Sequence, residues 1–330
     1  SGKSFHIITV YLYQLKHFNR VAGVQGGDSI LQQIAGQLGA LCGQKVTRIT
    51  GKRFLVLTSS LEEYEYYFVK LKRLFDVNNV EDKNIAIPVI ISGIINAQKL
   101  EESGLIMEYA EYLESLTPQS GLTEVIQDDR QTMNGFMYYK RVEQYLHKAI
   151  EEDLFEVYYQ PVYSTMERRF ITVEALSRLY HPELGWIAPD VFIQIAEKNH
   201  MIEQITDMQF RRICRFLKEN RELMSRLLNV KVNLSSLDLM RNDCSSHFIR
   251  MMDEYEIRHE WIQFEITETV ATEYSASLGM VVDGLTAAGI RLCLDDFGSG
   301  YANLNTVMRL PFSTIKLDRS LLFDICNDEK

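Results

Sequence analysis

The chain has 330 residues and a mass of 38.3 kDa, which is enough for one large domain or two ordinary ones. Hydrophobic residues make up 46% and charged residues 24%, the balance of a globular protein with ample apolar surface for a core. The formal net charge of −10 excludes a general nucleic-acid binder, and we expect no DNA partner. An anionic ligand is still compatible with this charge if metal ions mediate the contact.

No run approaches the roughly 18 apolar residues that cross a bilayer, and no signal-type start is present. Because the first residue is Ser1 rather than Met, we expect the cytoplasmic part of a longer protein, with any sensory segment before Ser1. The cysteines are odd in number and scattered, which predicts reduced thiols and argues against zinc; they are Cys42, Cys214, Cys244, Cys293 and Cys326.

The first block of the chain predicts a β-α-β-β-α-β order. FHIITVYLY reads as a strand, GDSILQQIAGQLGALCG as a helix and KVTRITGKRFLVLTSS as a hairpin. EEYEYYFVKLKRLFDV then reads as a helix and IAIPVIISGII as a strand, which together predict a compact ferredoxin-like α+β sheet. The TPQSG stretch and the charged helix YYKRVEQYLHKAIEEDL place the boundary near 115–145.

The second block alternates short β-rich runs with helical patterns. Six strands are predicted, and the amphipathic stretches 189–205 and 274–290 between them indicate parallel strands joined by crossover helices. The strands are FEVYYQPVYS, RFITVEAL, NVKVNLSS, WIQFEITET, IRLCLDDFG and STIKLD.

Polar residues recur where these strands end. In an α/β barrel the strand ends share one mouth, so the acids would repel one another unless cations lay among them. Oxygen ligands suit Mg²⁺ or Mn²⁺, and two such ions about 3.5–4 Å apart form a device for cleaving phosphodiesters. The alternative is that each acid is a solvated strand end or a helix cap, but the recurrence favours a site. The residues are Glu174, Asn233, Glu265, Asp295, Asp296, Lys316 and Asp318.

Residues 140 to 330 resemble an EAL domain, the bacterial phosphodiesterase that opens cyclic di-GMP to linear pGpG. The resemblance is carried in order by YYQP, EALSRLYHPELGWIAPDVFIQIAE, VNLS, FEITET, DDFGSGYANL and LPFSTIKLD. It implies a (β/α)8 TIM-type barrel over 151–330, of which about six βα units are present, after a linker helix at 131–150. The barrel is therefore expected to be incomplete at its C-terminal end, where the family carries a further glutamate and a glutamine.

The resemblance also implies roles for individual residues. The first metal would be held by Glu174, Asn233, Glu265 and Asp295, and Asp296 would share the second. Lys316 would contact the attacking water or the phosphate, and Arg178 would clamp a phosphate oxygen. Gln160 would contact a guanine edge, Asp318 the substrate, and Glu268 would brace the loop 297–304 that leads to a dimer interface. In that loop Gly298 and Gly300 are read as regulatory rather than as a plain turn, and Ser299 replaces the family's usual Thr.

Residues 1–130 resemble a GGDEF domain, the diguanylate cyclase fold, through LKHFNRVAGVQGGDSILQQIAGQL and RITGKRFLVL. Gly26, Gly27 and Asp28 look like the signature but match an earlier family stretch. The signature position is Thr50, Gly51, Lys52, Arg53 and Phe54, where cyclases place acids for metal-bound GTP. Tyr11 replaces a metal-ligating aspartate, and LCGQ at 41–44 replaces the product-inhibition motif. Reversed charge abolishes a metal site, so no cyclase activity is expected.

Asn19 and Asp28 match family positions that touch guanine, which leaves GTP binding without turnover as one interpretation. The other is retention for the fold, with Asn19 holding a turn and Asp28 capping the following helix. We expect this block to regulate or to form a homodimer. For the whole chain, the leading hypothesis is a cyclic di-GMP phosphodiesterase using Mg²⁺ or Mn²⁺. The alternatives are an inactive cyclic di-GMP receptor and a scaffold that only dimerises.

Overall fold

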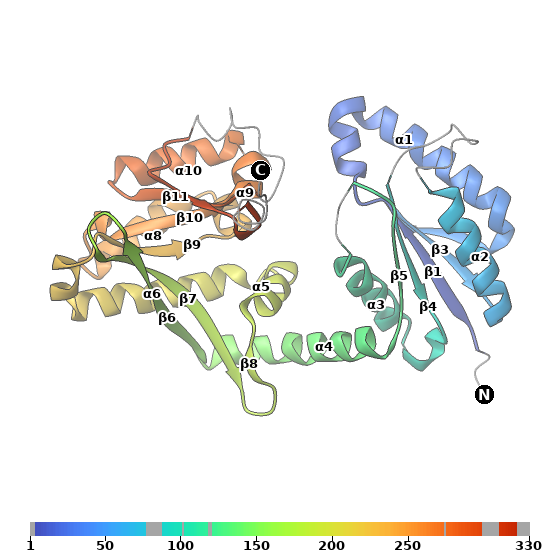
Figure 1. The fold of residues 1–330 in the computed structure, drawn as a ribbon, viewed down its shortest axis with the longest axis horizontal. Helices are drawn as coiled ribbons and strands as arrows, with labels where there is room; N and C mark the ends of the chain where they lie inside the picture. Colours follow the sequence, from blue (N-terminus) through green and yellow to red (C-terminus); the bar gives the residue numbers. More distant parts are fainter. Residues whose placement is uncertain are drawn as a thin grey trace, which may run out of the picture. The chain divides into compact units, whose positions relative to one another are not determined.

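The computed structural model describes residues 4–76, 88–100, 102–117, 121–273, 275–298 and 310–321. The chain divides into two compact units, Ser1–Tyr138 and Tyr139–Lys330 (Figure 1). Helix α4 (Arg130–Glu151) crosses this division. Within the described part of the chain, no helix combines the length and apolar character that a membrane crossing would need.

Unit 1 is built on one five-stranded sheet with the strand order β2-β3-β1-β4-β5. Strand β1 pairs antiparallel with β3 and β4, and β4 pairs parallel with β5. The strands are β1 (His6–Tyr11), β2 (Val46–Thr50), β3 (Arg53–Thr58), β4 (Ile90–Ile94) and β5 (Glu124–Gln127). The helices are α1 (Leu15–Cys42), α2 (Leu61–Leu74) and α3 (Ser103–Ser115), with short 3₁₀ turns η1 (Gly43–Lys45) and η2 (Ala97–Leu100).

Both faces of the sheet of unit 1 are covered, and successive side chains of β1 point into two different hydrophobic clusters. Ile8 and Val10 pack with apolar residues of α1 and α2, whereas Ile7 packs with residues of α3. The predicted β-α-β-β-α-β order is observed, and the order β2-β3-β1-β4 is ferredoxin-like. The parallel edge strand β5 was not predicted, since four residues give too short a pattern.

Unit 2 contains a seven-stranded mixed sheet with the path β12-β11-β10-β9-β7-β6, and β8 pairs with β7. Its strands are β6 (Phe155–Ser164), β7 (Arg169–His181), β8 (Gly185–Ile187), β9 (Asn229–Asn233), β10 (Ile262–Thr267), β11 (Arg291–Phe297) and β12 (Thr314–Leu317). Its helices are α5 (Pro189–Lys198), α6 (Ile202–Glu219), α7 (Ser236–Met240), α8 (Cys244–Glu254), α9 (Glu268–Glu273) and α10 (Ser275–Ala287), with η3 (Arg221–Ser225) and η4 (His259–Trp261).

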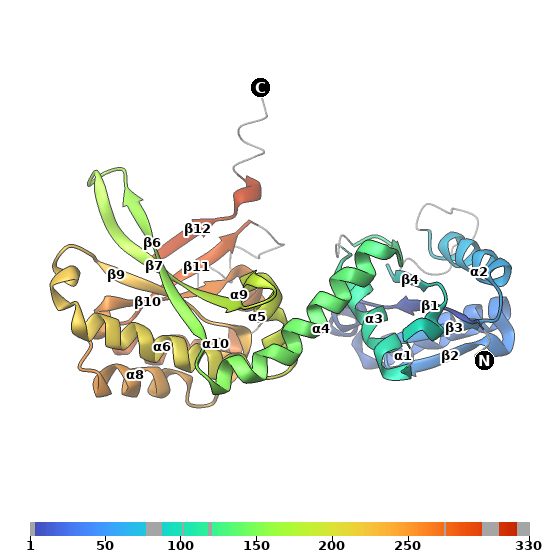
Figure 2. The same ribbon diagram turned by 90° about the horizontal axis from the view of Figure 1, so that it is seen from below.

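The prediction of six parallel strands was wrong at the first pair. Strands β6 and β7 form a long antiparallel hairpin, seen clearly in Figure 2, and parallel pairing runs only from β7 through β12. Only residues 165–168 join β6 to β7, and a parallel connection needs a crossover of a dozen or more residues. The structure therefore shows an open mixed sheet rather than six equivalent βα units.

The predicted amphipathic stretch 189–205 is two helices. α5 ends at Lys198, and α6 begins at Ile202. His200 between them has a φ of 56°, a left-handed conformation that ends the first helix. The break lets α6 turn onto the sheet while α5 covers the start of the hairpin.

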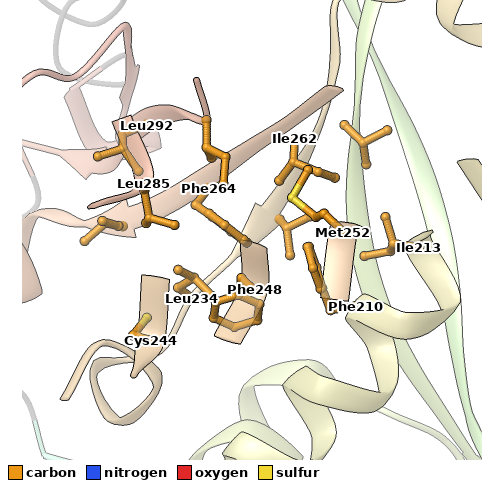
Figure 3. Packing of buried hydrophobic residues seen from close by; sticks show 14 of the residues in the cluster. Phe210, Ile213, Leu234, Cys244, Phe248, Met252, Ile262, Phe264, Leu285 and Leu292 are labelled. Atoms are coloured by element: carbon orange, nitrogen blue, oxygen red, sulfur yellow. The ribbon is translucent and has the colours of Figure 1, made fainter. Parts of the chain in front are cut away.

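The core of unit 2 lies on one face of the sheet. Along β10, Ile262, Phe264 and Ile266 point into this core, where Phe264 packs against Phe210 of α6 and Phe248 of α8 (Figure 3). Strand alternation therefore sends Gln263 and Glu265 to the opposite face. That opposite face is polar, and it carries the side chains described next.

The free cysteines of the described residues are all buried. Burial raises the pKa of Cys42 to about 11, and burial raises the pKa of Cys214, Cys244 and Cys293 to about 12. Such thiols stay protonated near neutral pH and act as small apolar groups. Cys326 lies outside the described residues.

Candidate active site

Three carboxylates from strands β7, β10 and β11 meet on the polar face of unit 2. Glu174 of β7, Glu265 of β10 and Asp295 of β11 each offer an oxygen atom, and these atoms all lie within 4.8 Å of one another. We call these three residues the acidic cage. A cluster of hard oxygen ligands at this spacing fits a divalent ion such as Mg²⁺ or Mn²⁺. Glu174 lies in the middle of β7 and not at its end, because the strand continues to His181.

The ammonium group of Lys316 on β12 lies among the three carboxylates. Its Nζ is 3.1 Å from Glu174 Oε2, 3.0 Å from Glu265 Oε2 and 2.9 Å from Asp295 Oδ2. Burial opposes the charged form of this lysine, but the hydrogen bond with Asp295 and the charges of the two glutamates outweigh it and raise the pKa of Lys316. The three carboxylates therefore favour the charged form of Lys316.

Two residues of β9 contact carboxylates of the cage. Asn233 donates from Nδ2 to Glu174 Oε1 at 3.2 Å, and the Nζ of Lys231 lies 3.1 Å from Glu265 Oε1. Burial and the charge of Glu174 raise the pKa of Glu265, and the two lysines oppose that shift. Lys231 was missed in the sequence, although its place two residues before Asn233 puts it on the same strand face.

Asp296 follows the cage residue Asp295 but faces another way. Its φ of 54° is left-handed, and its backbone N–H donates to Asp295 Oδ1 at 2.9 Å. Burial, together with the charges of Asp295 and Asp318, raises the pKa of Asp296. Its carboxylate is not one of the three that meet in the cage, and it lines a cavity. Of the two adjacent aspartates, Asp295 therefore belongs to the cage, and Asp296 lines the cavity.

Glu268 lies directly after β10 and is 2% exposed. Its Oε2 accepts a hydrogen bond from the backbone N–H of Gly298, at the start of the loop predicted to be braced. Gly298 has a φ of 97°, and a Cβ there would meet the side chain of Leu321. Both observations require glycine at this position. Ser299, Gly300 and the loop as far as residue 309 lie outside the described residues.

A cavity of 580 Å³ reaches Asn233, which donates a hydrogen bond to the cage residue Glu174, but none of the three cage carboxylates lines it. Its volume is typical of a small-molecule site. Arg178, Asn233 and Asp296 line it, and so does Gln209 of α6. The guanidinium of Arg178 lies over the ring of Tyr158, with Cζ 5.7 Å from the ring centroid. A positive, planar group in the wall suits a phosphate oxygen.

Two residues predicted to bind substrate do not line this cavity. Gln160 is exposed on β6, directly across the hairpin from Glu174. Asp318 follows β12, and its Oδ1 accepts from the backbone N–H of Ser320 at 2.8 Å. Hydrogen bonds from the Ser320 side chain and backbone lower the pKa of Asp318. Gln160 adjoins the cage, whereas Asp318 caps a turn in this state.

Comparison with known proteins assigns unit 2 to a family. The model of the EAL domain matches residues 143–330, more than half of the chain. The chain belongs to the EAL family. The acidic cage and the cavity therefore lie within the EAL domain.

Known proteins resemble this EAL domain protein in sequence, and solved structures resemble it in fold. Cyclic di-GMP phosphodiesterase NbdA of Pseudomonas aeruginosa is 24% identical over 329 residues, covering 98% of this chain and 42% of the relative. The structure titled PaMucR phosphodiesterase in a c-di-GMP complex is 28% identical with a TM-score of 0.54, covering 57% of this chain and 76% of that one. The chain spans less than half the length of NbdA and of other curated relatives that it matches.

One solved structure resembles the chain over its whole length, not only in the EAL domain. It is LapD of Vibrio cholerae, titled S helix-GGDEF-EAL bound to c-di-GMP, with 15% identity and a TM-score of 0.69. The match covers 100% of this chain and 78% of that one. At this identity the likeness concerns the fold alone.

Residues 50–54, predicted to be a degenerate cyclase signature, lie on the β2–β3 hairpin, and Arg53 among them is buried. Arg53 is 7% exposed and forms hydrogen bonds with Glu114 of α3 at 2.6 and 3.0 Å and with Glu111 at 3.0 Å. The ring of Tyr11 lies 5.0 Å from Lys52 Nζ and 5.1 Å from Arg53 Cζ. Two cations thus lie beside the Tyr11 ring, and Arg53 is in addition bound to two carboxylates of α3.

The two residues predicted to contact guanine both lie inside α1. Asn19 therefore holds no turn, and its buried Oδ1 lies against Gly27, where a Cβ would meet it at 1.7 Å. Asp28 caps no helix, because α1 consists of two helical segments joined at the non-helical Gly23 (φ 76°, ψ 168°), and Asp28 lies inside the second of them. The predicted cap was wrong because the helix begins earlier than the GDSILQQ pattern indicated.

Gln209 is a buried amide without a hydrogen-bond partner among the described residues. It is 5% exposed and interrupts the apolar stripe of α6 between Ile205 and Ile213. We expect Gln209→Leu to raise the free energy of unfolding by about 1–2 kcal/mol, because an unpaired buried amide is lost at similar volume. Urea denaturation followed by the two tryptophans, both in the EAL domain, measures this effect. The exposed neighbour change Gln204→Leu should have almost no effect, and a destabilised Gln209→Leu would contradict the expectation.

Proposed function

We propose that the chain hydrolyses cyclic di-GMP to linear pGpG at the acidic cage. The observation that carries this proposal is the convergence of Glu174, Glu265 and Asp295 from three strands within an EAL domain. Membership of the EAL family and the titles of NbdA and PaMucR support the substrate. The same proposal includes a TIM-type barrel as the fold of the EAL domain. It also includes a cytoplasmic location for the protein.

Different residues of the chain would bind each of the two divalent ions and the substrate. Glu174, Asn233, Glu265 and Asp295 would hold the first ion, and Asp296 the second. When bound, such ions polarise a phosphoryl oxygen and lower the pKa of an attacking water.

The remaining roles belong to side chains around the cage. Lys316, held as a cation, would stabilise the negative charge that develops on the phosphate. Arg178 would clamp a phosphate oxygen from the cavity wall, and Gln160 and Asp318 would contact the dinucleotide. Glu268 would fix the loop after Gly298.

Unit 1 would be a degenerate GGDEF domain over 1–130, followed by a linker helix at 131–150 and the EAL domain at 151–330. Its signature arginine is bound to Glu114 and Glu111, which supports a role in regulation or homodimer formation and no synthesis of cyclic di-GMP. Residual GTP binding would rest on Asn19 and Asp28, and Asp28 is exposed on α1.

A second candidate function is a receptor that binds cyclic di-GMP without cleaving it. The observation in its favour is that two ammonium groups, Lys316 and Lys231, already compensate the cage carboxylates. Such compensation weakens the need for a metal ion.

Metal removal separates the two functions. We expect the chain with Mn²⁺ or Mg²⁺ to convert cyclic di-GMP to pGpG, and excess chelator to slow this at least about a thousandfold. Chromatography follows the product, and readdition of the ion should restore the rate. Tight binding of cyclic di-GMP without turnover in either ion would instead establish the receptor, and turnover that survives chelation would refute the metal site.

A further inference from the structure

Beneath the acidic cage lies a second ammonium group that the proposed reaction does not use. The side chain of Lys231 is 6% exposed, and its Nζ lies 3.1 Å from Glu265 Oε1 and 3.9 Å from Cys293 Sγ. A buried lysine keeps its charge only where an anion replaces its lost hydration. Among the described residues, Glu265 is the one carboxylate within ion-pair distance of Lys231.

Each of the two lysines contacts a different oxygen atom of Glu265. Lys231 holds Oε1 from below, while Lys316 contacts Oε2 at 3.0 Å. The side chain of Lys316 is 29% exposed, so it has room to move toward solvent, whereas Lys231 is enclosed. The carboxylate of Glu265 is itself 0% exposed, so Lys231 fixes its orientation and leaves only Oε2 toward the cage.

We propose that Lys231 is a fixed counter-cation that sets the affinity of the acidic cage for divalent metal. This inference rests on the proposed metal site. With Lys316 turned away, three carboxylates give a formal charge of −3, and Lys231 reduces it to −2. The cage therefore attracts a divalent ion less strongly than its acids alone would, and Glu265 can offer it a single oxygen.

Titration of the full chain with Mn²⁺, followed by electron paramagnetic resonance without substrate, tests the inference. We expect Lys231→Met to bind Mn²⁺ at least about tenfold tighter, because a unit charge a few ångströms from a divalent ion has that effect even when screened as in water. Lys231→Gln keeps a donor for Glu265 but loses the charge, so it should bind tighter too. Lys231→Arg keeps the charge and should bind like the wild type.

The outcomes separate this inference from the proposed function. If the wild type binds Mn²⁺ as tightly as both neutral variants, or more tightly, the proposed role of Lys231 is wrong. The proposed metal site is unaffected by that result. Absence of Mn²⁺ binding in the wild type would refute the metal centre itself, and the inference with it. If Lys231→Met loses its circular dichroism spectrum, Lys231→Gln decides the question. Glu265→Gln, which removes a cage charge, is the negative control for binding.

Discussion

Replacing Glu174 with alanine is expected to reduce the hydrolysis of cyclic di-GMP about a thousandfold or more. Glu174 contributes one of the three clustered carboxylates, and its two oxygens contact Asn233 and Lys316. A metal centre supplies several kcal/mol of charge stabilisation in the transition state, and each 1.36 kcal/mol is about tenfold in rate. Release of pGpG under single-turnover conditions measures the loss.

The fold should survive this change, because the side chain of Glu174 is 17% exposed and Lys316 keeps two other carboxylate partners, Glu265 and Asp295. We therefore expect an unaltered circular dichroism spectrum. The matched control is Glu167→Ala, at the β6–β7 turn, where a 44% exposed carboxylate pairs with Arg169. Its activity should stay within about twofold of the wild type, since exposed ion pairs contribute little. Activity of Glu174→Ala within tenfold of the wild type would contradict the cage as the reaction centre.

Replacing Arg53 with methionine should destabilise unit 1 by about 3–5 kcal/mol at neutral pH, because it leaves the buried carboxylate of Glu114 without its cation. Glu114 is 5% exposed, and its other hydrogen bond comes from the hydroxyl of Thr9 at 3.1 Å. Both tryptophans lie in unit 2, so hydrogen exchange of β1 and β4, read by mass spectrometry, is the measurement.

This destabilisation should depend on pH with a definite sign. Burial raises the pKa of Glu114 above its usual value of 4.5 even though Arg53 opposes the shift. A raised carboxyl pKa means that the folded state binds the proton more tightly, so stability is gained as pH falls through that pKa. We expect the Arg53→Met defect to shrink from pH 8 toward pH 5.

Two comparisons decide the interpretation of Arg53. Lys52→Met, an exposed cation beside the same Tyr11 ring, should change stability by less than about 0.5 kcal/mol. The pair Arg53→Met with Glu114→Leu should recover most of the loss, since removing both charges leaves none unpaired. An Arg53→Met protein as stable as the Lys52→Met protein would show that the buried ion pair is dispensable.

Sequence patterns predicted the parts of the fold that depend on periodicity. Strand β10 could be predicted because WIQFEITET alternates apolar and polar residues, and this alternation also sends Glu265 to the polar face. Residues that follow parallel strands share one edge, so the meeting of Glu265 and Asp295 could be foreseen. Individual site roles, by contrast, came from resemblance and remain predictions.

Features that depend on contacts far apart in the sequence could not be read in this way. The antiparallel β6–β7 pair was detectable only from its short connection, and the break between α5 and α6 depends on the left-handed His200. Lys231 looked like an ordinary basic residue in a strand, because nothing local shows that Glu265, 34 residues later, lies beside it. The partner of Arg53 on α3 was hidden for the same reason.

The left-handed backbone of Asp296 restricts what evolution can place there. A φ of 54° is readily adopted by aspartate, asparagine and glycine, whereas residues with longer or branched side chains would strain the turn. Of these three residue types, asparagine is the one that keeps both the left-handed turn and a polar side chain but removes the negative charge. A lineage could lose the proposed metal ligand at this position through a single nucleotide change and keep the backbone shape beside the cavity.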